Sequence, residues 1–179
     1  MKQFFLAVWE VVEVVAIAVV TVFVIRTYLV QPFLVSGASM EPNFSTGDYL
    51  IIDEVSYRFR EPSRGEAIVF RYPENPSVFY IKRVIGVPNE RVIVHDGKVK
   101  IINMEHPQGF MVEEQYLNPS IRTMGEIDEV LGKDQYFVLG DNRNYSYDSR
   151  NWGLLPKDNV IGVVRLRLFP FNELKAFTY

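Results

Sequence analysis

The feature that most constrains the fold of this chain is an apolar stretch at its N-terminus. From Phe4 to Ile25 the sequence runs for 22 residues with only two charged side chains, Glu10 and Glu13. A helix needs about 20 predominantly apolar residues to cross the hydrocarbon core of a bilayer. The uncharged part, Val14–Ile25, has 12 residues, so the length also suits a helix buried in a protein core.

Three interpretations of this stretch compete. A core helix is disfavoured because no polar stripe appears beyond the two glutamates. A cleaved leader is disfavoured because the small residues Ser36–Ala38 lie far beyond the apolar stretch, and cleavage sites normally follow such stretches closely. We therefore predict an uncleaved single-pass anchor within residues 1–30, with Arg26 and Tyr28 at one membrane interface. Beyond Glu41 no charge-free run exceeds seven residues, so no second span is expected.

Residues 31–179 have the composition of a soluble globular domain. Only four Lys, Arg, Asp and Glu residues fall within residues 1–35, and the other 37 lie in the remaining 144 residues. The absence of Cys excludes disulfides, a thiolate nucleophile and Cys-ligated metal. The two histidines, His95 and His106, are interpreted as surface residues and leave little for a His-built metal site. We expect no metal and no cofactor. A net charge of −3 without a basic run argues against nucleic acid as a partner.

After Gln31-Pro32 the pattern changes from helical to β. Short β-branched and aromatic runs separated by turn residues predict strands at Tyr49–Ile52, Ala67–Phe70, Val78–Val87, Arg91–Val94, Val99–Ile102, Tyr136–Leu139 and Val160–Phe169. Asp96-Gly97 predicts a tight hairpin. In the last strand, Arg165 and Arg167 alternate with apolar residues, which predicts one exposed face. Residues 103–133 are interpreted as an excursion from a mainly β fold, in which residues 126–131 could form one or two helical turns.

Two of the four patches that could carry chemistry lie before residue 53. In Val35–Pro42, small residues surround Ser39, so a substrate backbone could approach its hydroxyl closely. Judged alone, this patch is better interpreted as a linker. The second patch, Gly47–Ile52, is a turn that leads into a strand, and alone it indicates structure only.

The third patch, Phe79–Gly86, places a lysine inside an apolar strand. Alternation puts Lys82 on one face with Tyr80 and Val84. Desolvation among such neighbours lowers a lysine pKa, and a neutral amine can act as a general base. The commoner explanation of a strand lysine is protection of a sheet edge.

The fourth patch, Gly140–Arg150, is dense in hydrogen-bonding side chains and follows a predicted strand. Solvated loops often have this composition. An ordered network is the alternative, in which Asp148 and Arg150 pair and Ser146 holds a nearby amine.

Taken together and in this order, the patches resemble the type I signal peptidases, membrane-anchored proteases of the Ser-Lys dyad class. The matching segments are Ile25–Thr27, Gly37–Pro42, Gly47–Leu50, Tyr80–Pro88, Gly140–Arg143, Ser146, Asp148–Arg150 and Arg165–Phe171. The chain departs from the family pattern at Asn43-Phe44, Asn89-Glu90 and Asn144-Tyr145. These departures leave the nucleophile and the base in place, and they bear on substrate preference and local packing.

The resemblance implies a mainly β fold, in which a single N-terminal transmembrane helix precedes an antiparallel, barrel-like catalytic domain of the signal peptidase type. It implies Ser39 as nucleophile, with its N–H in the oxyanion hole, and Lys82 as general base. Gly37 stands where some relatives have a serine hydroxyl, so a backbone group or water must serve there. Ser146 would hydrogen-bond Lys82, and a pair of Asp148 with Arg150 would shape the loop that carries Ser146.

The resemblance further implies preproteins as substrates, bound extended by β-augmentation, with small residues at positions −1 and −3 before the cut. The expected contacts are Met40, Pro42, Tyr80 and Ile81, with apolar surface near Phe33 and Leu34 at the membrane face. We expect a single-pass protein of the cell membrane with its catalytic domain on the outer face. Lys2 and the free N-terminus favour a cytoplasmic N-terminus, and Arg26 on the other flank partly cancels their effect. The bilayer is then a partner, together with the secretion machinery.

Two alternatives stay open at this stage. One is a membrane-anchored accessory β module with a decayed site. The other is a related Ser-Lys peptidase with a dedicated substrate, such as pilins; a self-cleaving repressor is disfavoured by the apolar N-terminus. Asn43-Phe44-Ser45 and Asn144-Tyr145-Ser146 are glycosylation patterns inside the candidate site. A glycan there would block access, which favours a compartment without N-glycosylation, such as the outer face of a bacterial membrane.

Overall fold

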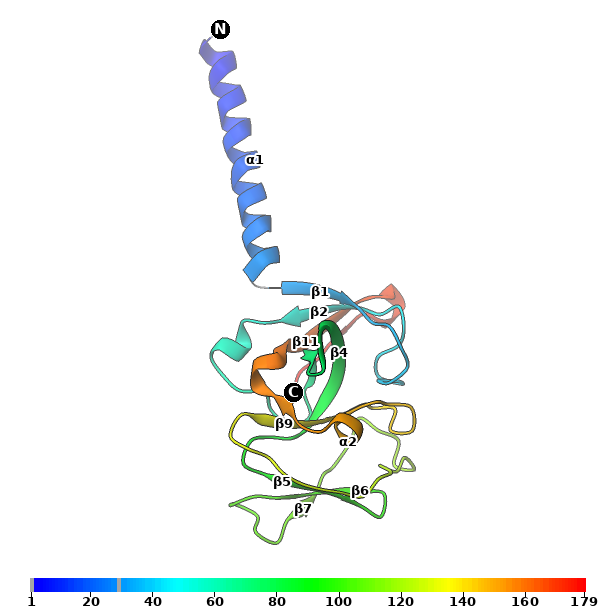
Figure 1. Cartoon of the computed structure of the whole chain (residues 1–179). Helices are drawn as coiled ribbons and strands as arrows, with labels where there is room; N and C mark the ends of the chain where they lie inside the picture. Colours follow the sequence, from blue (N-terminus) through cyan, green and yellow to red (C-terminus); the bar gives the residue numbers. More distant parts are fainter. Residues whose placement is uncertain (1, 29) are drawn as a thin grey trace.

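The computed structural model describes the backbone of residues 2–28 and 30–179, and the side chains of residues 8–22 and 31–179. One long helix, α1 (Lys2–Tyr28), stands away from the rest of the chain (Figure 1). Its large apolar side chains between Val8 and Val22 are exposed. In the described part of the chain, no helix is both long enough and apolar enough to cross a membrane. The two ends of the predicted anchor, residues 1–7 and 23–30, have side chains outside the described residues.

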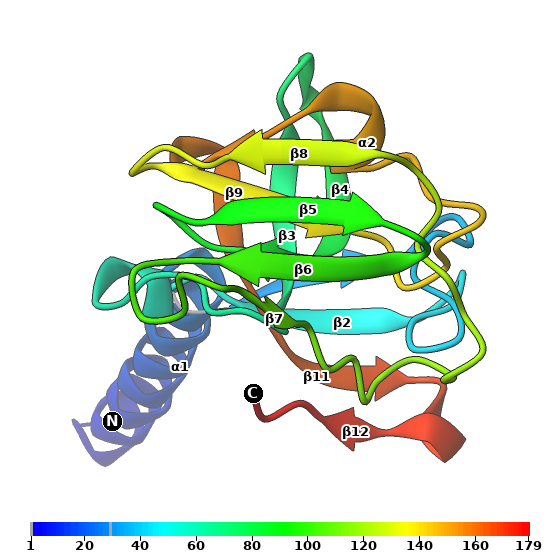
Figure 2. The same cartoon turned by 90° about the horizontal axis from the view of Figure 1, so that it is seen from below.

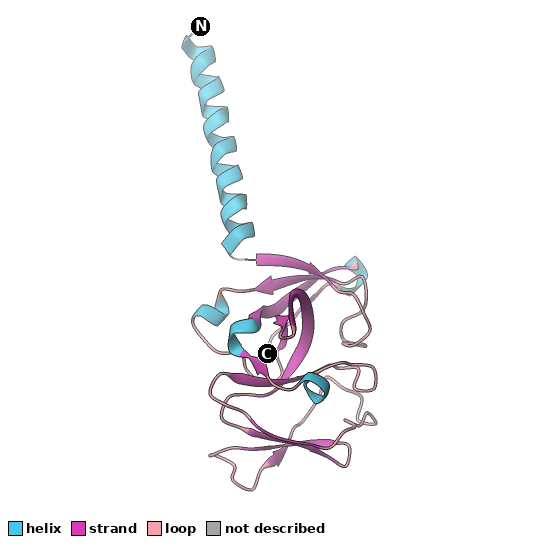
Figure 3. Cartoon of the chain, in the orientation of Figure 1, coloured by secondary structure: helices cyan, strands magenta, loops and turns pink. Residues whose placement is uncertain are grey.

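The rest of the chain is mainly β, as predicted (Figure 3). The larger sheet is antiparallel and has the strand order β1-β2-β11-β3-β4-β9-β10, with β12 paired to β11. Its strands are β1 (Val30–Leu34), β2 (Tyr49–Asp53), β3 (Ala67–Tyr72), β4 (Asn75–Gly86), β9 (Gln135–Leu139), β10 (Leu155–Pro156), β11 (Val160–Phe169) and β12 (Lys175–Ala176). The short helices are η1 (Ser56–Arg58), α2 (Ser149–Trp152), η2 (Lys157–Asn159) and η3 (Phe171–Glu173).

A smaller antiparallel sheet lies on the side of the domain away from α1 (Figures 1 and 2). Its order is β7-β6-β5-β8, formed by β5 (Arg91–His95), β6 (Lys98–Ile102), β7 (Phe110–Met111) and β8 (Ile127–Val130). The β5–β6 hairpin turns at Asp96-Gly97, both with positive φ, as predicted. The helical turns considered for residues 126–131 are wrong. A helix that short is marginal, whereas β8 satisfies the backbone groups along one edge of β5.

Strand β4 links the apolar clusters of the domain because its side chains alternate between faces. Ile81 packs with the cluster that contains Val35 and Leu50, whereas Tyr80 and Val84 pack with the cluster around Phe70. The predicted separation of the two faces of this strand is confirmed. It places Lys82 on the same face as Tyr80.

Strand β11 does not have the exposed arginine face that the sequence predicted. Register shifts against β2 occur between Val164 and Leu166 and between Arg167 and Phe169. A bulge moves the following side chains to the other face of a strand. Arg167 is therefore buried, with its Nη1 2.9 Å from Asp48 Oδ2.

Candidate active site

Ser39 and Lys82 meet although 43 residues separate them in the sequence. Ser39 lies in the loop between β1 and β2, and Lys82 lies on β4. Lys82 Nζ donates hydrogen bonds to Ser39 Oγ at 2.8 Å and to the carbonyl oxygen of Ile81 at 3.0 Å. The lysine is only 3% exposed. A hydroxyl and an amine at this distance form a nucleophile and base pair when the amine is neutral.

Burial lowers the pKa of Lys82 to about 8, because the charged amine is poorly solvated here. The nearby carboxylates of Asp148 and Asp141 act in the opposite direction. Each of them is paired with an arginine: Asp148 Oδ1 lies 2.8 Å from Arg150 Nε, and Asp141 Oδ2 lies 2.5 Å from Arg83 Nη2. These ion pairs weaken the effect of the two carboxylates on Lys82, so burial remains the larger influence on its pKa.

The loop that carries Ser39 is held by the loop that follows β9. The backbone N–H of Asn142 donates to Ser39 O at 3.0 Å, and its side-chain Nδ2 donates to Ala38 O at 3.0 Å. Asn43 Nδ2 lies 2.9 Å from Asp141 Oδ2 and 2.9 Å from the Tyr116 carbonyl. Asn43, one of the departures from the family pattern, therefore joins the nucleophile loop to both segments. These contacts fix the position of the Ser39 hydroxyl.

The hydrogen bond expected between Ser146 and Lys82 is not formed. Ser146 Oγ is buried without a partner among the described residues, and the hydrogen bonds of Lys82 Nζ go to Ser39 and Ile81. Ser146 lies instead against Gly140. A Cβ at Gly140 would lie 2.2 Å from Ser146 Oγ and 2.4 Å from Ser39 O.

This close approach predicts that Gly140→Ala damages the site. A methyl group at 2.4 Å from a backbone oxygen forces the Ser39 segment or Ser146 to move. We expect kcat/KM to fall about 100-fold and the free energy of unfolding to fall by about 1–3 kcal/mol. The control is Gly132→Ala, whose Cβ would meet the flexible Gln135 side chain at 3.0 Å. Equal kinetics in both variants would contradict the prediction.

Asp148 and Arg150 form an ion pair that shapes the loop around Ser146. Asp148 is fully buried, caps α2 and accepts a hydrogen bond from Gly140 N–H at 3.0 Å. Arg150 Nη2 donates to the Arg143 carbonyl at 2.7 Å. The pair thereby ties the two ends of the loop together.

The sequence interpretation missed a second buried ion pair. Arg83 and Asp141 are 5% and 0% exposed, and two hydrogen bonds of 2.7 and 2.5 Å join them. Arg83 also lies over the Tyr116 ring, with 3.9 Å from Cζ to the centroid. The sequence held one sign of this ion pair, an arginine on the apolar face of β4. Its partner could not be identified because it lies 58 residues away.

A groove of about 170 Å³ opens beside Ser39, between β1 and β4. Its walls combine the apolar side chains of Phe33, Leu34, Val35, Phe79 and Ile81 with polar groups from Ser36, Ser39 and Tyr80. In the described chain, β1 is paired on one side by β2, and β9 pairs with β4 only from Arg83 onward. Both strands therefore present free edges at the groove.

Tyr80 and Ile81 line this groove, but two other expected contacts do not. Met40 is 1% exposed and belongs to the core cluster with Phe44. The turn after Ser39 directs its side chain inward, so a substrate contact through Met40 is wrong. Pro42 is exposed but does not line the groove. Gly37 has φ of +103°, and its N–H donates to Thr46 Oγ1 at 3.0 Å.

Comparisons with known proteins bear on this arrangement. The family model described as signal peptidase, peptidase S26, matches residues 8–169. Signal peptidase I of Leptolyngbya laminosa is 39% identical over 92% of this chain and 81% of that protein. Signal peptidase IB of Staphylococcus aureus (strain COL) is 31% identical over 90% of this chain and 89% of that protein. A crystal structure of a signal peptidase I from Enterococcus faecalis V583 is 28% identical, with a TM-score of 0.48, over 58% of this chain and 97% of that chain.

Proposed function

This chain belongs to the signal peptidase family, peptidase S26, and on that premise we propose that it removes N-terminal signal peptides from preproteins with a Ser39–Lys82 dyad. The observation that carries the proposal is the distance of 2.8 Å between Lys82 Nζ and Ser39 Oγ in a buried setting beside a groove. A role as catalytic base explains why a lysine is buried here without an acidic partner at contact distance.

In the first half of the reaction, neutral Lys82 accepts the proton of Ser39 Oγ as the oxygen attacks the scissile carbonyl. Lys82 then gives this proton to the leaving amine, the C–N bond breaks, and an acyl-enzyme on Ser39 remains. In the second half, Lys82 takes a proton from water as the water oxygen attacks the ester carbonyl. Lys82 then gives this proton to Ser39 Oγ as the ester C–O bond breaks, which releases the new carboxyl terminus and restores free Ser39 and neutral Lys82. No other base is required.

The negative oxygen of each tetrahedral intermediate needs hydrogen-bond donors. The backbone N–H of Ser39 has no acceptor among the described residues, so it is available for this role. The N–H of Gly37 is bound to Thr46 and is not available without a rearrangement. We therefore propose Ser39 N–H as the first donor. We expect the second donor to be a water molecule or a backbone N–H that becomes available when substrate binds.

The groove supports binding of an extended substrate with small side chains near the cut. The free edges of β1 and β4 offer backbone hydrogen bonds to a strand placed between them. Alternate side chains of that strand, at positions −1 and −3, then point the same way. The cavity of about 170 Å³, lined in part by the touching rings of Phe33 and Phe79, is below the usual size of ligand pockets, about 300–1,000 Å³. Small residues fit there, and large ones do not.

We further propose that α1 anchors the domain, residues 31–179, on the outer face of the cell membrane with the N-terminus in the cytoplasm. The support is the exposure of Val8–Val22, because exposed apolar surface of this kind marks a contact with lipid or protein. The apolar residues Phe4–Ala7 and Phe23–Ile25 extend the stretch in sequence. We also propose an association with the secretion machinery at this location.

The pH dependence of cleavage tests the role of Lys82. Below its pKa of about 8 the amine is protonated and cannot accept the Ser39 proton, so kcat/KM should fall about tenfold per pH unit. Above the pKa the rate should level off. The measurement is peptide cleavage from pH 6 to pH 10, with thermal unfolding at each pH as control. A flat profile over this range contradicts the base role.

The proposed activity itself is tested with the full chain and a preprotein in detergent micelles. We expect one cut, with small residues at −1 and −3, identified by sequencing the new N-terminus of the product. A serine-reactive acylating inhibitor should add its mass to the Ser39 peptide. An intact preprotein together with an unlabelled Ser39 would instead indicate an accessory module with a decayed site.

A further inference from the structure

A second cavity, of about 370 Å³, lies next to the base of α1. Its lining includes Gln31, Glu54, Tyr57, Arg58, Arg71 and Phe79. Gln31 follows Tyr28, the last residue of α1, by three positions, and three extended residues reach at most about 11 Å. Figures 1 and 2 both show η1, which carries Arg58, close to the base of α1. The cavity therefore lies where the surface of a membrane would be.

The charges that line this cavity favour an anion. Arg58 and Arg71 are both exposed and form no ion pair with the described residues. The guanidinium of Arg71 lies over the Phe79 ring, 5.0 Å from its centroid, and its Nη1 donates to the Pro76 carbonyl at 3.4 Å. Glu54 is the one acidic side chain in the described lining. Two guanidinium groups against one carboxylate leave a positive excess, and such groups bind phosphate well.

Glu54 adds a second requirement on the ligand. Its Oε1 is buried and has no hydrogen-bond partner among the described residues. Burial raises the pKa of this carboxyl, and the charges of Arg58 and Arg71 counteract that rise. A buried acceptor without a donor costs free energy. A ligand with a hydroxyl close to its phosphate would supply the missing donor.

The neighbouring surface fits a lipid rather than a soluble anion. Phe59, directly after η1, is 85% exposed, and aromatic side chains favour the headgroup level of a bilayer. The same ring, Phe79, lines both this cavity and the substrate groove. An occupant held by Arg71 would therefore also support one wall of the groove.

We propose that this cavity binds the headgroup of an anionic phospholipid with hydroxyl donors, as in phosphatidylglycerol. Arg58 and Arg71 hold the phosphate, and Glu54 accepts a hydrogen bond from the headgroup hydroxyl. The inference rests on the proposed function in one respect, the anchoring of α1 in the membrane. It adds a specific lipid contact beside the site of cleavage.

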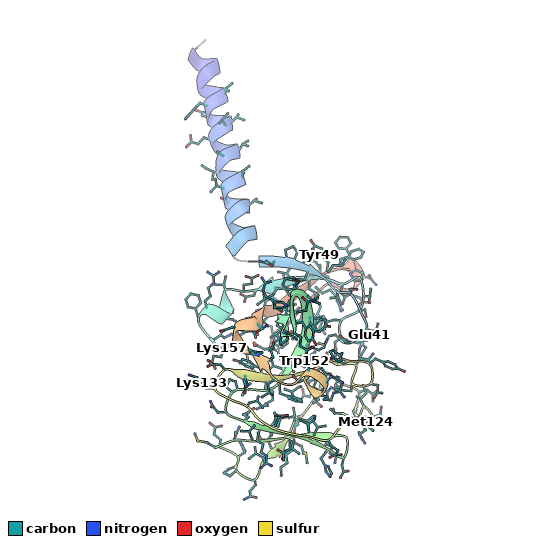
Figure 4. All side chains as sticks on the ribbon, in the orientation of Figure 1. Glu41, Tyr49, Met124, Lys133, Trp152 and Lys157 are labelled. Atoms are coloured by element: carbon teal, nitrogen blue, oxygen red, sulfur yellow. The ribbon has the colours of Figure 1, made fainter. Side chains whose placement is uncertain are left out.

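Native mass spectrometry of the full chain, released from neutral detergent micelles, tests this site. We expect phosphatidylglycerol to bind more tightly than phosphatidylmethanol, which lacks the hydroxyls, and both to bind more tightly than phosphatidylcholine. The double variant Arg58→Gln/Arg71→Gln should weaken phosphatidylglycerol binding about 30-fold, about fivefold for each arginine. The control Lys98→Gln/Lys133→Gln removes the same charge from exposed positions, and Figure 4 shows Lys133 on the body of the domain away from α1. It should bind as the parent does.

Three outcomes overturn the proposal. Unchanged phosphatidylglycerol binding in the Arg58→Gln/Arg71→Gln variant would show that the lipid does not bind in this cavity. Equal binding of phosphatidylglycerol and phosphatidylmethanol would show that Glu54 does not bind a headgroup hydroxyl. Free glycerol phosphate that binds as tightly as the lipid shows a soluble anion instead. Cleavage of a preprotein in the same micelles tests the proposed function separately. If the unmutated protein cleaves the preprotein but binds the three lipids equally, only the headgroup site is refuted. If it prefers phosphatidylglycerol but does not cleave, only the peptidase function is refuted.

Discussion

Ser39→Ala and Lys82→Met are each expected to lower kcat/KM for a preprotein by a factor of ~10⁴ or more. Ser39→Ala removes the atom that forms the acyl-enzyme. Lys82→Met keeps the side-chain volume but removes the amine that lies 2.8 Å from Ser39 Oγ. The double variant should lose little more than either single variant, because the two groups act as a unit. The measurement is single-turnover cleavage with excess enzyme.

Stability separates this loss from a folding defect. Lys82 is 3% exposed and makes no ion pair among the described residues, so no opposite charge at contact distance offsets the desolvation of its amine. Lys82→Met should therefore unfold at the same temperature as the parent or higher. Two variants serve as matched kinetic controls. Ser45→Ala changes a serine on the loop that carries Ser39, and Lys98→Met changes an exposed lysine of the smaller sheet. Parent-like cleavage by Ser39→Ala or Lys82→Met would refute the dyad.

Arg83→Met is expected to cost about 3–5 kcal/mol of unfolding free energy, because it leaves Asp141 buried without a counter-charge. Asp141 is fully buried and also holds Asn43 at 2.9 Å. A loss of this size lowers the unfolding temperature by about 10 °C in a domain of this length. The nucleophile loop should loosen as well, so cleavage should fall with stability. Thermal unfolding and peptide cleavage on the same preparations measure both effects.

The chain provides a close control for this substitution. Arg91 and Asp128 are joined by the same Nη2–Oδ2 distance, 2.5 Å, but their side chains are 47% and 52% exposed. Water screens such a pair, so Arg91→Met should leave the unfolding temperature close to that of the parent. If Arg83→Met and Arg91→Met lower the unfolding temperature equally, burial is not the reason that the Arg83–Asp141 pair stabilises the fold.

Much of the β structure could be predicted because strand patterns are local. The seven predicted strands correspond to β2, β3, β4, β5, β6, β9 and β11, and the Asp96-Gly97 hairpin forms as expected. Strands β1 and β8 and the two-residue strands β7, β10 and β12 were not predicted. Pro32 lies within β1 on an edge of the sheet, where a missing N–H is tolerated. The short run of β8 has no strong pattern, and it becomes a strand because β5 offers it hydrogen bonds.

The direction of individual side chains depended on irregularities that no periodicity reveals. Arg167 is buried because β11 shifts its register against β2. Met40 enters the core because the chain turns directly after Ser39. Ser146 is buried against Gly140 without a hydrogen bond to Lys82, whose amine reaches Ser39 and Ile81. Each of these depends on contacts between distant segments.

The sequence by itself determined which residues carry the candidate chemistry and where the apolar N-terminal stretch meets the body of the chain. Local spacing and residue type suffice for that, because a serine among small residues and a lysine in an apolar strand are visible within a few positions. Only the tertiary structure decided which groups meet. The contact of Lys82 with Ser39 spans 43 residues, and that of Arg83 with Asp141 spans 58. Such distances, and the burial that lowers the pKa of Lys82, arise from strand pairing and core packing, which short sequence patterns do not encode.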